Sequence, residues 1–154
     1  MVAMRKAKVV WENDLVHGKG RVRLGTNALP DFAVTWASRS EKAEGKTSPE
    51  ELLAAAQASC YAMALSATLA RKGNPPDRLD VTAECTFDSA ALKITTMAIN
   101  VIGKVPGLDQ SKFHSVAEEA ERICPVTNAL RSNVAITLSA HLASPEDAAR
   151  MKEE

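Results

Sequence analysis

The stretch SPEELLAAAQASCYAMALSATLA, residues 48–70, carries almost no charge and predicts the central helix of the fold. Ser48 suits the N-cap, Pro49 suits the first helical position, and Glu51 stands three residues after the cap, as in a capping box. Gly73 and the prolines that follow it mark the end of the helix. A helix this apolar must be covered on nearly all sides, so we expect a second copy of the chain to help cover it.

Composition narrows the class of protein. The 154 residues include 19 Lys plus Arg and 19 Asp plus Glu, so the formal net charge is zero and no nucleic acid or membrane partner is expected. Polar residues inside the apolar run, such as Gln57 and Thr68, weaken its drive to enter a membrane. The N-terminal residues lack the apolar core of a signal peptide. We therefore expect a cytoplasmic protein with reduced thiols.

Alternation of polar and apolar residues predicts strands on both sides of the central helix. The expected strands are residues 6–11, 21–24, 31–37, 79–88, 94–105 and 134–142, and the further helices are residues 111–123 and 126–130. This order is typical of an α+β fold, with antiparallel sheets packed around long central helices. Residues 1–143 are expected to form a single domain, and residues 144–154 a charged C-terminal tail that is a frayed helix or disordered.

Three cysteines are present, widely spaced and without a CxxC motif, which argues against a disulfide scaffold and a structural zinc site. Cys85 falls on the apolar phase of a strand and is expected in the core. The apolar and small neighbours of Cys60 allow two interpretations: a thiol that fills space in the core, or a nucleophile. As a nucleophile it would need a cation from elsewhere, because the helix N-terminus is about three turns away. Cys124 precedes Pro125 at a helix start, where backbone N–H groups favour a thiolate.

The histidines do not suggest a metal or catalytic site. His17 lies in an expected turn, His114 on an amphipathic helix and His141 on the polar phase of a strand, so all three are expected at the surface. No glycine-rich loop for a phosphate is present. We therefore expect neither a metal nor a cofactor.

Three segments together resemble the OsmC/Ohr family of thiol-dependent hydroperoxide reductases. They are TSPEELLAAAQASCYAMALS, CPVTNAL and, upstream, WENDLVHGKG, and the last favours the OsmC branch. The resemblance extends over residues 9–142. It implies an intertwined homodimer of α+β fold with two active sites at the subunit interface. It also implies reduction of organic hydroperoxides to alcohols, in defence against oxidative or osmotic stress.

The resemblance assigns roles residue by residue. Cys60 matches the peroxidatic cysteine, Cys124 the resolving cysteine and Glu50 the active-site glutamate. The arginine matches Arg39 by the OsmC pattern, while the Ohr pattern points to Arg21 or Arg23. Ser40 stands where the family commonly has an aromatic residue after the arginine, which bears on the arginine assignment and on the shape of the substrate pocket.

The chemistry that the resemblance implies takes place at two cysteine sulfur atoms. The Arg39 guanidinium, held by Glu50, would stabilise the Cys60 thiolate, which attacks a peroxide oxygen and becomes a sulfenic acid. Cys124 would then form a disulfide with Cys60, and an external thiol or dithiol would reduce it.

Helix geometry gives a separate reason to expect a dimeric site. Glu50 and Cys60 are separated along one helix by roughly 15 Å and cannot touch within it. Two copies crossing antiparallel near Ala55 would bring Glu50 of one copy to Cys60 of the other.

Two other functions are weighed: a non-catalytic dimer that binds an apolar ligand between its helices, with inert cysteines, and a cysteine hydrolase or acyltransferase. The second needs a base that the histidines do not supply.

Overall fold

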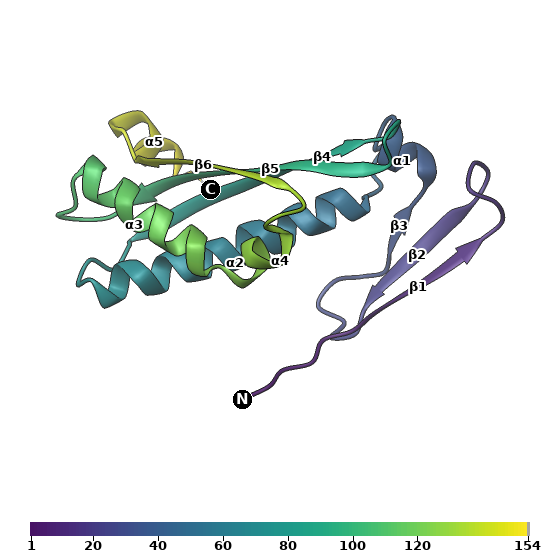
Figure 1. The fold of residues 1–154 in the computed structure, drawn as a ribbon, viewed down its shortest axis with the longest axis horizontal. Helices are drawn as coiled ribbons and strands as arrows, with labels where there is room; N and C mark the ends of the chain where they lie inside the picture. Colours follow the sequence, from purple (N-terminus) through teal and green to yellow (C-terminus); the bar gives the residue numbers. More distant parts are fainter. Residues whose placement is uncertain (154) are drawn as a thin grey trace. The chain divides into compact units, whose positions relative to one another are not determined.

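The computed structural model describes residues 1–153 of the chain. The elements are β1 (Ala7–Glu12), β2 (Lys19–Leu24), β3 (Phe32–Val34), α1 (Trp36–Ser40), α2 (Pro49–Arg71), β4 (Arg78–Asp88), β5 (Lys93–Lys104), α3 (Gln110–Ile123), α4 (Pro125–Leu130), β6 (Ala135–Leu142) and α5 (Pro145–Arg150) (Figure 1). The predicted α+β class is confirmed. The chain divides into two compact units, Met1–Leu52 and Leu53–Glu154. That residues 1–143 form one domain stays a prediction.

The first unit is built on an antiparallel sheet in the order β1-β2-β3, the meander that the alternation predicts. Trp11 of β1 lies opposite Gly20 of β2. A Cβ on Gly20 would lie 2.7 Å from the Val34 side chain and 2.9 Å from the Trp11 ring. Glycine is therefore required at this position so that the two side chains can cover the strand.

The predicted strand over residues 31–37 is wrong in its second half. β3 ends at Val34, and residues 36–40 form the short helix α1. Thr35 and Ser38 form a reciprocal capping box, in which each side chain accepts a hydrogen bond from the other residue's backbone N–H. These two capping hydrogen bonds start a helix where the hydrophobic alternation alone suggested a continued strand.

The second unit contains a sheet in the order β4-β5-β6. β4 and β5 form a long antiparallel hairpin, whereas β5 and β6 run parallel. The expectation of purely antiparallel sheets is therefore wrong for this pair. The chain leaves the end of β5 through α3 and α4 before it enters β6, and such a helical crossover returns it to the opposite end of the sheet.

The core of the second unit lies between the sheet and two helices. α2 and α3 lie on the same side of the sheet (Figure 1), and their inward side chains meet those of β5. The fully buried members are Tyr61, Leu65, Leu69, Met97, Val101, Phe113, Ala117, Ala120 and Cys124. Gly103 on β5 leaves room for the Phe113 ring, because a Cβ there would lie 2.5 Å from it.

α2 begins and ends where the sequence predicts. The Ser48 hydroxyl accepts a hydrogen bond of 3.1 Å from the Glu51 N–H, and the Glu51 carboxylate accepts one from the Thr47 hydroxyl. At the other end Gly73 adopts φ +81°, and the Asn74 N–H donates to the Leu69 carbonyl. The hydrogen bonds of the Glu51 N–H and of the Leu69 carbonyl satisfy backbone groups that a helix end leaves unpaired.

The apolar surface of α2 is only partly covered in one chain. By length and composition α2 could cross a membrane, yet within its most apolar 18-residue stretch just 28% is buried inside the single chain. Ala55, Ala56 and Ser59 are exposed, and Met63 is 69% exposed. The single chain therefore leaves a stripe of small and apolar side chains open along this helix.

The C-terminal residues form a short helix of their own. α5 is capped by Ser144, whose hydroxyl accepts from the Asp147 N–H. Met151 is 5% exposed, and its carbonyl accepts a hydrogen bond from the Arg78 guanidinium. These contacts attach the end of the chain to the second unit.

Candidate active site

Arg39 and Glu50 form an ion pair within the first unit. The Arg39 Nε lies 3.0 Å and 3.2 Å from the two carboxylate oxygens of Glu50, and Nη2 lies 2.8 Å from Oε1. The Glu50 side chain is 7% exposed and that of Arg39 31%. A guanidinium held by two nitrogens keeps a fixed orientation. The expected pairing of Glu50 with Arg39 is therefore present.

Short local hydrogen bonds position this pair. Arg39 lies on α1, and Glu50 lies in the first turn of α2, where a carboxylate is favoured by the helix dipole. The Ser38 hydroxyl donates to the Thr47 carbonyl at 2.9 Å, which closes the loop between the two helices. Because this hydrogen bond closes the loop beside Arg39, the Arg39 side chain lies opposite Glu50.

Cys60 and Cys124 form the second pair, within the second unit. Both thiols are free, Cys60 packs against the buried cluster that contains Cys124, and the two are close enough for each to shift the pKa of the other. Cys60 is half-buried on α2, whereas Cys124 is fully buried and is the N-cap residue of α4, just before Pro125. The fold thus brings together two cysteines that are far apart in the sequence.

The surroundings of the two thiols shift their pKa values in opposite directions. Burial raises the pKa of Cys60, and its contact with Cys124 adds to this against an opposing effect of the Val126 N–H. Burial also acts to raise the pKa of Cys124, but the polar groups of Thr127, together with the Cys60 thiol, outweigh it and the pKa is lowered. Among the described residues of its own unit, the net effect of the surroundings of Cys60 is to raise its pKa.

Two residues beside Cys124 had no expected role. Gln57 and Thr127 are both fully buried, and the Gln57 Nε2 donates to the Thr127 Oγ1 at 2.8 Å. The available signals were a glutamine in an apolar helix, one turn before Cys60, and a threonine three residues after Cys124. Neither signal is specific until the tertiary structure joins the two segments.

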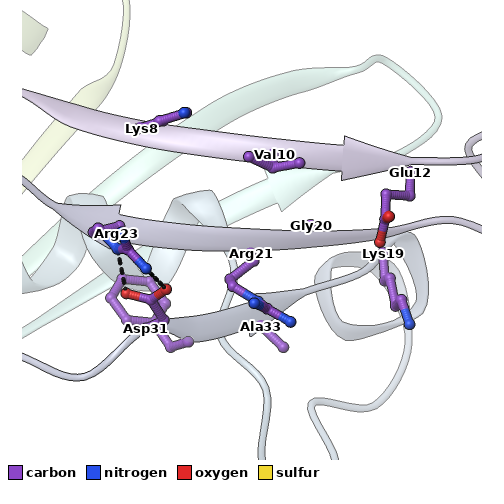
Figure 2. Close-up of a pocket in the computed structure, with 10 residues that line it drawn as sticks. Lys8, Val10, Glu12, Lys19, Gly20, Arg21, Arg23, Asp31 and Ala33 are labelled. Atoms are coloured by element: carbon purple, nitrogen blue, oxygen red, sulfur yellow. Dashed lines mark hydrogen bonds and ion pairs between the residues drawn. The ribbon is translucent and has the colours of Figure 1, made fainter.

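Arg21 and Arg23, the alternative arginines, lie on β2 in a groove of about 410 Å³ on the first sheet (Figure 2). Arg23 holds Asp31 through two hydrogen bonds of 2.9 Å and 2.7 Å, which place the pKa of that carboxyl below its usual range. Arg21 lies opposite Ala33 of β3. Of the three candidate arginines, Arg39 is the one that contacts Glu50.

The remaining cysteine and the histidines lie apart from these pairs. Cys85 packs against the core from β4, as its apolar phase predicts. His17, His114 and His141 are all exposed, which confirms their expected place at the surface. Within residues 1–153, no group of three His, Cys, Asp or Glu side chains is arranged to hold a metal ion.

Comparison with known proteins decides the family. The model of the OsmC-like protein family matches residues 41–139, a range that contains Glu50 and both paired cysteines. The chain belongs to the OsmC-like family. The expected membership is confirmed, and the same range carries most of the fold described above.

Two relatives show the breadth of this family. The chain is 35% identical to Peroxiredoxin OsmC of Escherichia coli (strain K12) over 138 residues, which cover 88% of this chain and 96% of that protein. It is 30% identical to an organic hydroperoxide resistance protein of Xanthomonas axonopodis pv. citri over 98 residues, 60% of this chain and 66% of that protein. The OsmC relative is thus the nearer of the two, as the upstream segment suggested.

Solved structures share the OsmC-like fold. An organic hydroperoxide resistance protein OsmC from Legionella pneumophila matches with a TM-score of 0.70 and 22% identity, over 92% of this chain and 98% of that chain. An OsmC-like protein from Mycoplasma pneumoniae matches with a TM-score of 0.72 and 12% identity, over 94% of this chain and all of that chain. The fold is therefore retained at low sequence identity.

Proposed function

We propose that this OsmC-like protein is a cysteine-based peroxidase that reduces organic hydroperoxides to alcohols. The observation that carries the proposal is the packing of the free Cys60 thiol against the buried cluster that contains the free Cys124 thiol. Two thiols in contact can form one disulfide and release it again to a reductant. The names of the relatives, a peroxiredoxin and hydroperoxide resistance proteins, support the same reaction class.

In the proposed first step the Cys60 thiolate attacks one oxygen of the peroxide. The O–O bond breaks, the alcohol leaves with a proton, and Cys60 becomes a sulfenic acid. Burial raises the pKa of Cys60 within its own unit, so a cation is needed to favour the thiolate. We assign that role to Arg39, whose orientation is held by Glu50. The same guanidinium would stabilise charge that develops on the peroxide oxygens.

The second step closes the disulfide. Cys124 condenses with the sulfenic acid of Cys60, and water leaves. An external thiol or dithiol then reduces the disulfide and returns both thiols. No metal, flavin or nucleotide takes part in either step as proposed.

The active protein is proposed to be a homodimer with composite sites. Glu50 and Cys60 are separated along α2 by roughly 15 Å, so one straight helix cannot bring them together. The exposed Ala55 and Ala56 allow two α2 helices to cross closely, and Met63 beside them is 69% exposed. In this arrangement Arg39 and Glu50 of one protomer serve Cys60 of the other.

The test is a thiol count before and after a small excess of cumene hydroperoxide, with peptide mapping of any disulfide formed. We expect two thiols per chain to be lost, with Cys60 linked to Cys124 and Cys85 intact. In Cys124→Ser, Cys60 should stop at the sulfenic acid or oxidise further. Survival of all three thiols in folded protein would reject the peroxidase and favour a non-catalytic dimer that binds an apolar ligand.

A further inference from the structure

Gln57 is a buried amide whose presence in the core has no packing explanation. Its side chain is fully buried, yet within residues 1–153 its Oε1 has no hydrogen-bond partner. An unpaired buried carbonyl oxygen costs free energy that an apolar side chain of similar size would avoid. The other end of the amide is fully used, because Nε2 donates to Thr127 at 2.8 Å and lies 3.7 Å from the Cys124 sulfur.

The Gln57 amide nitrogen is shared between Thr127 and Cys124. An amide NH₂ group has two hydrogens, so it can donate to two acceptors at once. Nε2 donates to the Thr127 Oγ1 at 2.8 Å and to the Cys124 Sγ at 3.7 Å. The shorter hydrogen bond, to Thr127, fixes the amide so that its other N–H is directed at the Cys124 sulfur.

Donors aimed at sulfur favour the thiolate over the thiol. The direction of the shift agrees, since the pKa of Cys124 is lowered although the residue is fully buried. Gln57 also stands three residues before Cys60 on α2, so both side chains share one face of the helix. The amide therefore joins the turn that carries Cys60 to the helix that Cys124 caps.

We propose that Gln57 and Thr127 are positioning residues that hold the Cys124 sulfur for attack on Cys60 and so set the rate of disulfide formation. This inference rests on the proposed function. In the step concerned, the Cys124 thiolate attacks the sulfur of the Cys60 sulfenic acid. The S–S bond forms as the S–O bond breaks, and hydroxide leaves and takes up a proton as water. Cys124 is oxidised and the Cys60 sulfur is reduced, so the peroxide of the first step supplies the only oxidant.

The first test measures the titration of Cys124 by itself. In a Cys60→Ser/Cys85→Ser protein only one thiol remains, and its thiolate absorbance in the ultraviolet is followed against pH. We expect Gln57→Met to move the midpoint upward by about one unit or more, because a hydrogen bond to a charged group is lost. Thr127→Val, which removes the acceptor that fixes the Gln57 amide, should give a smaller upward shift, and Thr127→Ser should restore the original midpoint.

The second test separates the two chemical steps in single-turnover experiments with cumene hydroperoxide. Thr127→Val and Gln57→Met should slow disulfide formation by up to about tenfold at neutral pH, in proportion to the lost thiolate. Oxidation of Cys60 to the sulfenic acid should keep its rate. The matched control is Thr68→Val, which removes a fully buried hydroxyl that bonds the Ala64 carbonyl on the same helix. It should change neither step.

Unchanged midpoints and unchanged disulfide rates in folded Thr127→Val and Gln57→Met would overturn the inference. Equal slowing of both steps, or equal effects of Thr68→Val, would also overturn it, because general loosening of the core acts in that way. Gln57→Met carries both tests if Thr127→Val does not fold. If the unaltered protein forms no disulfide, the proposed function fails, whereas the Cys124 titration still decides whether the Gln57 amide acts on the sulfur.

Discussion

At the residue scale, Cys60, Cys85 and Cys124 are one residue type in three surroundings. Cys85 packs among apolar neighbours on β4, Cys60 is half-buried on a helix, and Cys124 at a helix start receives a hydrogen bond from Gln57. Reactivity of a thiol follows its thiolate fraction and its access to the oxidant. The neighbours, rather than the cysteines themselves, therefore separate the two proposed redox residues from the third.

Arg39→Lys tests the proposed activation of Cys60. Lysine keeps the charge but loses the two-nitrogen hold on Glu50, so the rate of Cys60 oxidation at neutral pH should fall by about 100-fold. Burial raises the pKa of Cys60, so the loss should shrink as pH rises and the thiol deprotonates without help. The measurement is the second-order rate with cumene hydroperoxide across pH.

The matched control is Arg23→Lys, because Arg23 holds Asp31 through two hydrogen bonds in the same manner. This variant should keep the unaltered pH profile. Equal losses in both variants would remove Arg39 from the proposed site.

At the element scale, two close contacts decide how the helices and strands join. Trp11 covers Gly20 between β1 and β2, and the Phe113 ring of α3 lies over Gly103 of β5. Neither contact follows from helix or strand propensity, because each depends on the absence of a side chain in the neighbouring element. The glycines in these strands are therefore packing positions.

Gly103→Ala should destabilise the protein by about 1–3 kcal/mol, because the new methyl group would meet the Phe113 ring in a packed core. The free energy of unfolding in urea gives the measurement. A second variant, Gly103→Ala with Phe113→Leu, should lose less than the sum of the two single changes, since the smaller side chain leaves room. Strict additivity in this double variant would contradict the contact.

At the scale of the whole molecule, a single chain leaves much of the apolar surface of α2 exposed to solvent. Only 28% of the most apolar 18-residue stretch of α2 is buried, and the exposed positions include Ala55 and Met63. Removing such surface from water is favourable. We expect a mass in solution of about twice the 16.5 kDa of one chain, measured by light scattering.

Mixing two inactive variants tests whether the sites are composite. Glu50→Gln and Cys60→Ser should each lose most peroxidase activity as homodimers. In a mixed dimer, one site would combine an intact Cys60 from the first protomer with an intact Glu50 from the second, so activity should return. Activity that stays absent after subunit exchange, confirmed by mass spectrometry, would place Glu50 and Cys60 of one protomer in the same site.

The sequence by itself determined the local elements. Capping at Ser48, the stop at Gly73 and the alternation in β4 are short-range signals, and such signals predicted α2 and every strand except β3 to within one or two residues. The same signals failed at residues 36–37, where a capping box begins a helix. They also failed to show that β6 pairs parallel to β5, because pairing depends on where α3 and α4 return the chain.

For the candidate site, the motifs pointed to Cys60, Cys124, Glu50 and Arg39 through family resemblance. Only the tertiary structure showed that Arg39 pairs with Glu50 and that Cys60 packs against the cluster that contains Cys124. A role for Gln57 and Thr127 could not be predicted, because it depends on the hydrogen bond between them, which joins two segments distant in the sequence. Local sequence specifies helix ends and strand faces through contacts a few residues apart. The chemical environment of a side chain is instead set by segments distant in the chain, and here that environment distinguishes Cys124 from Cys60.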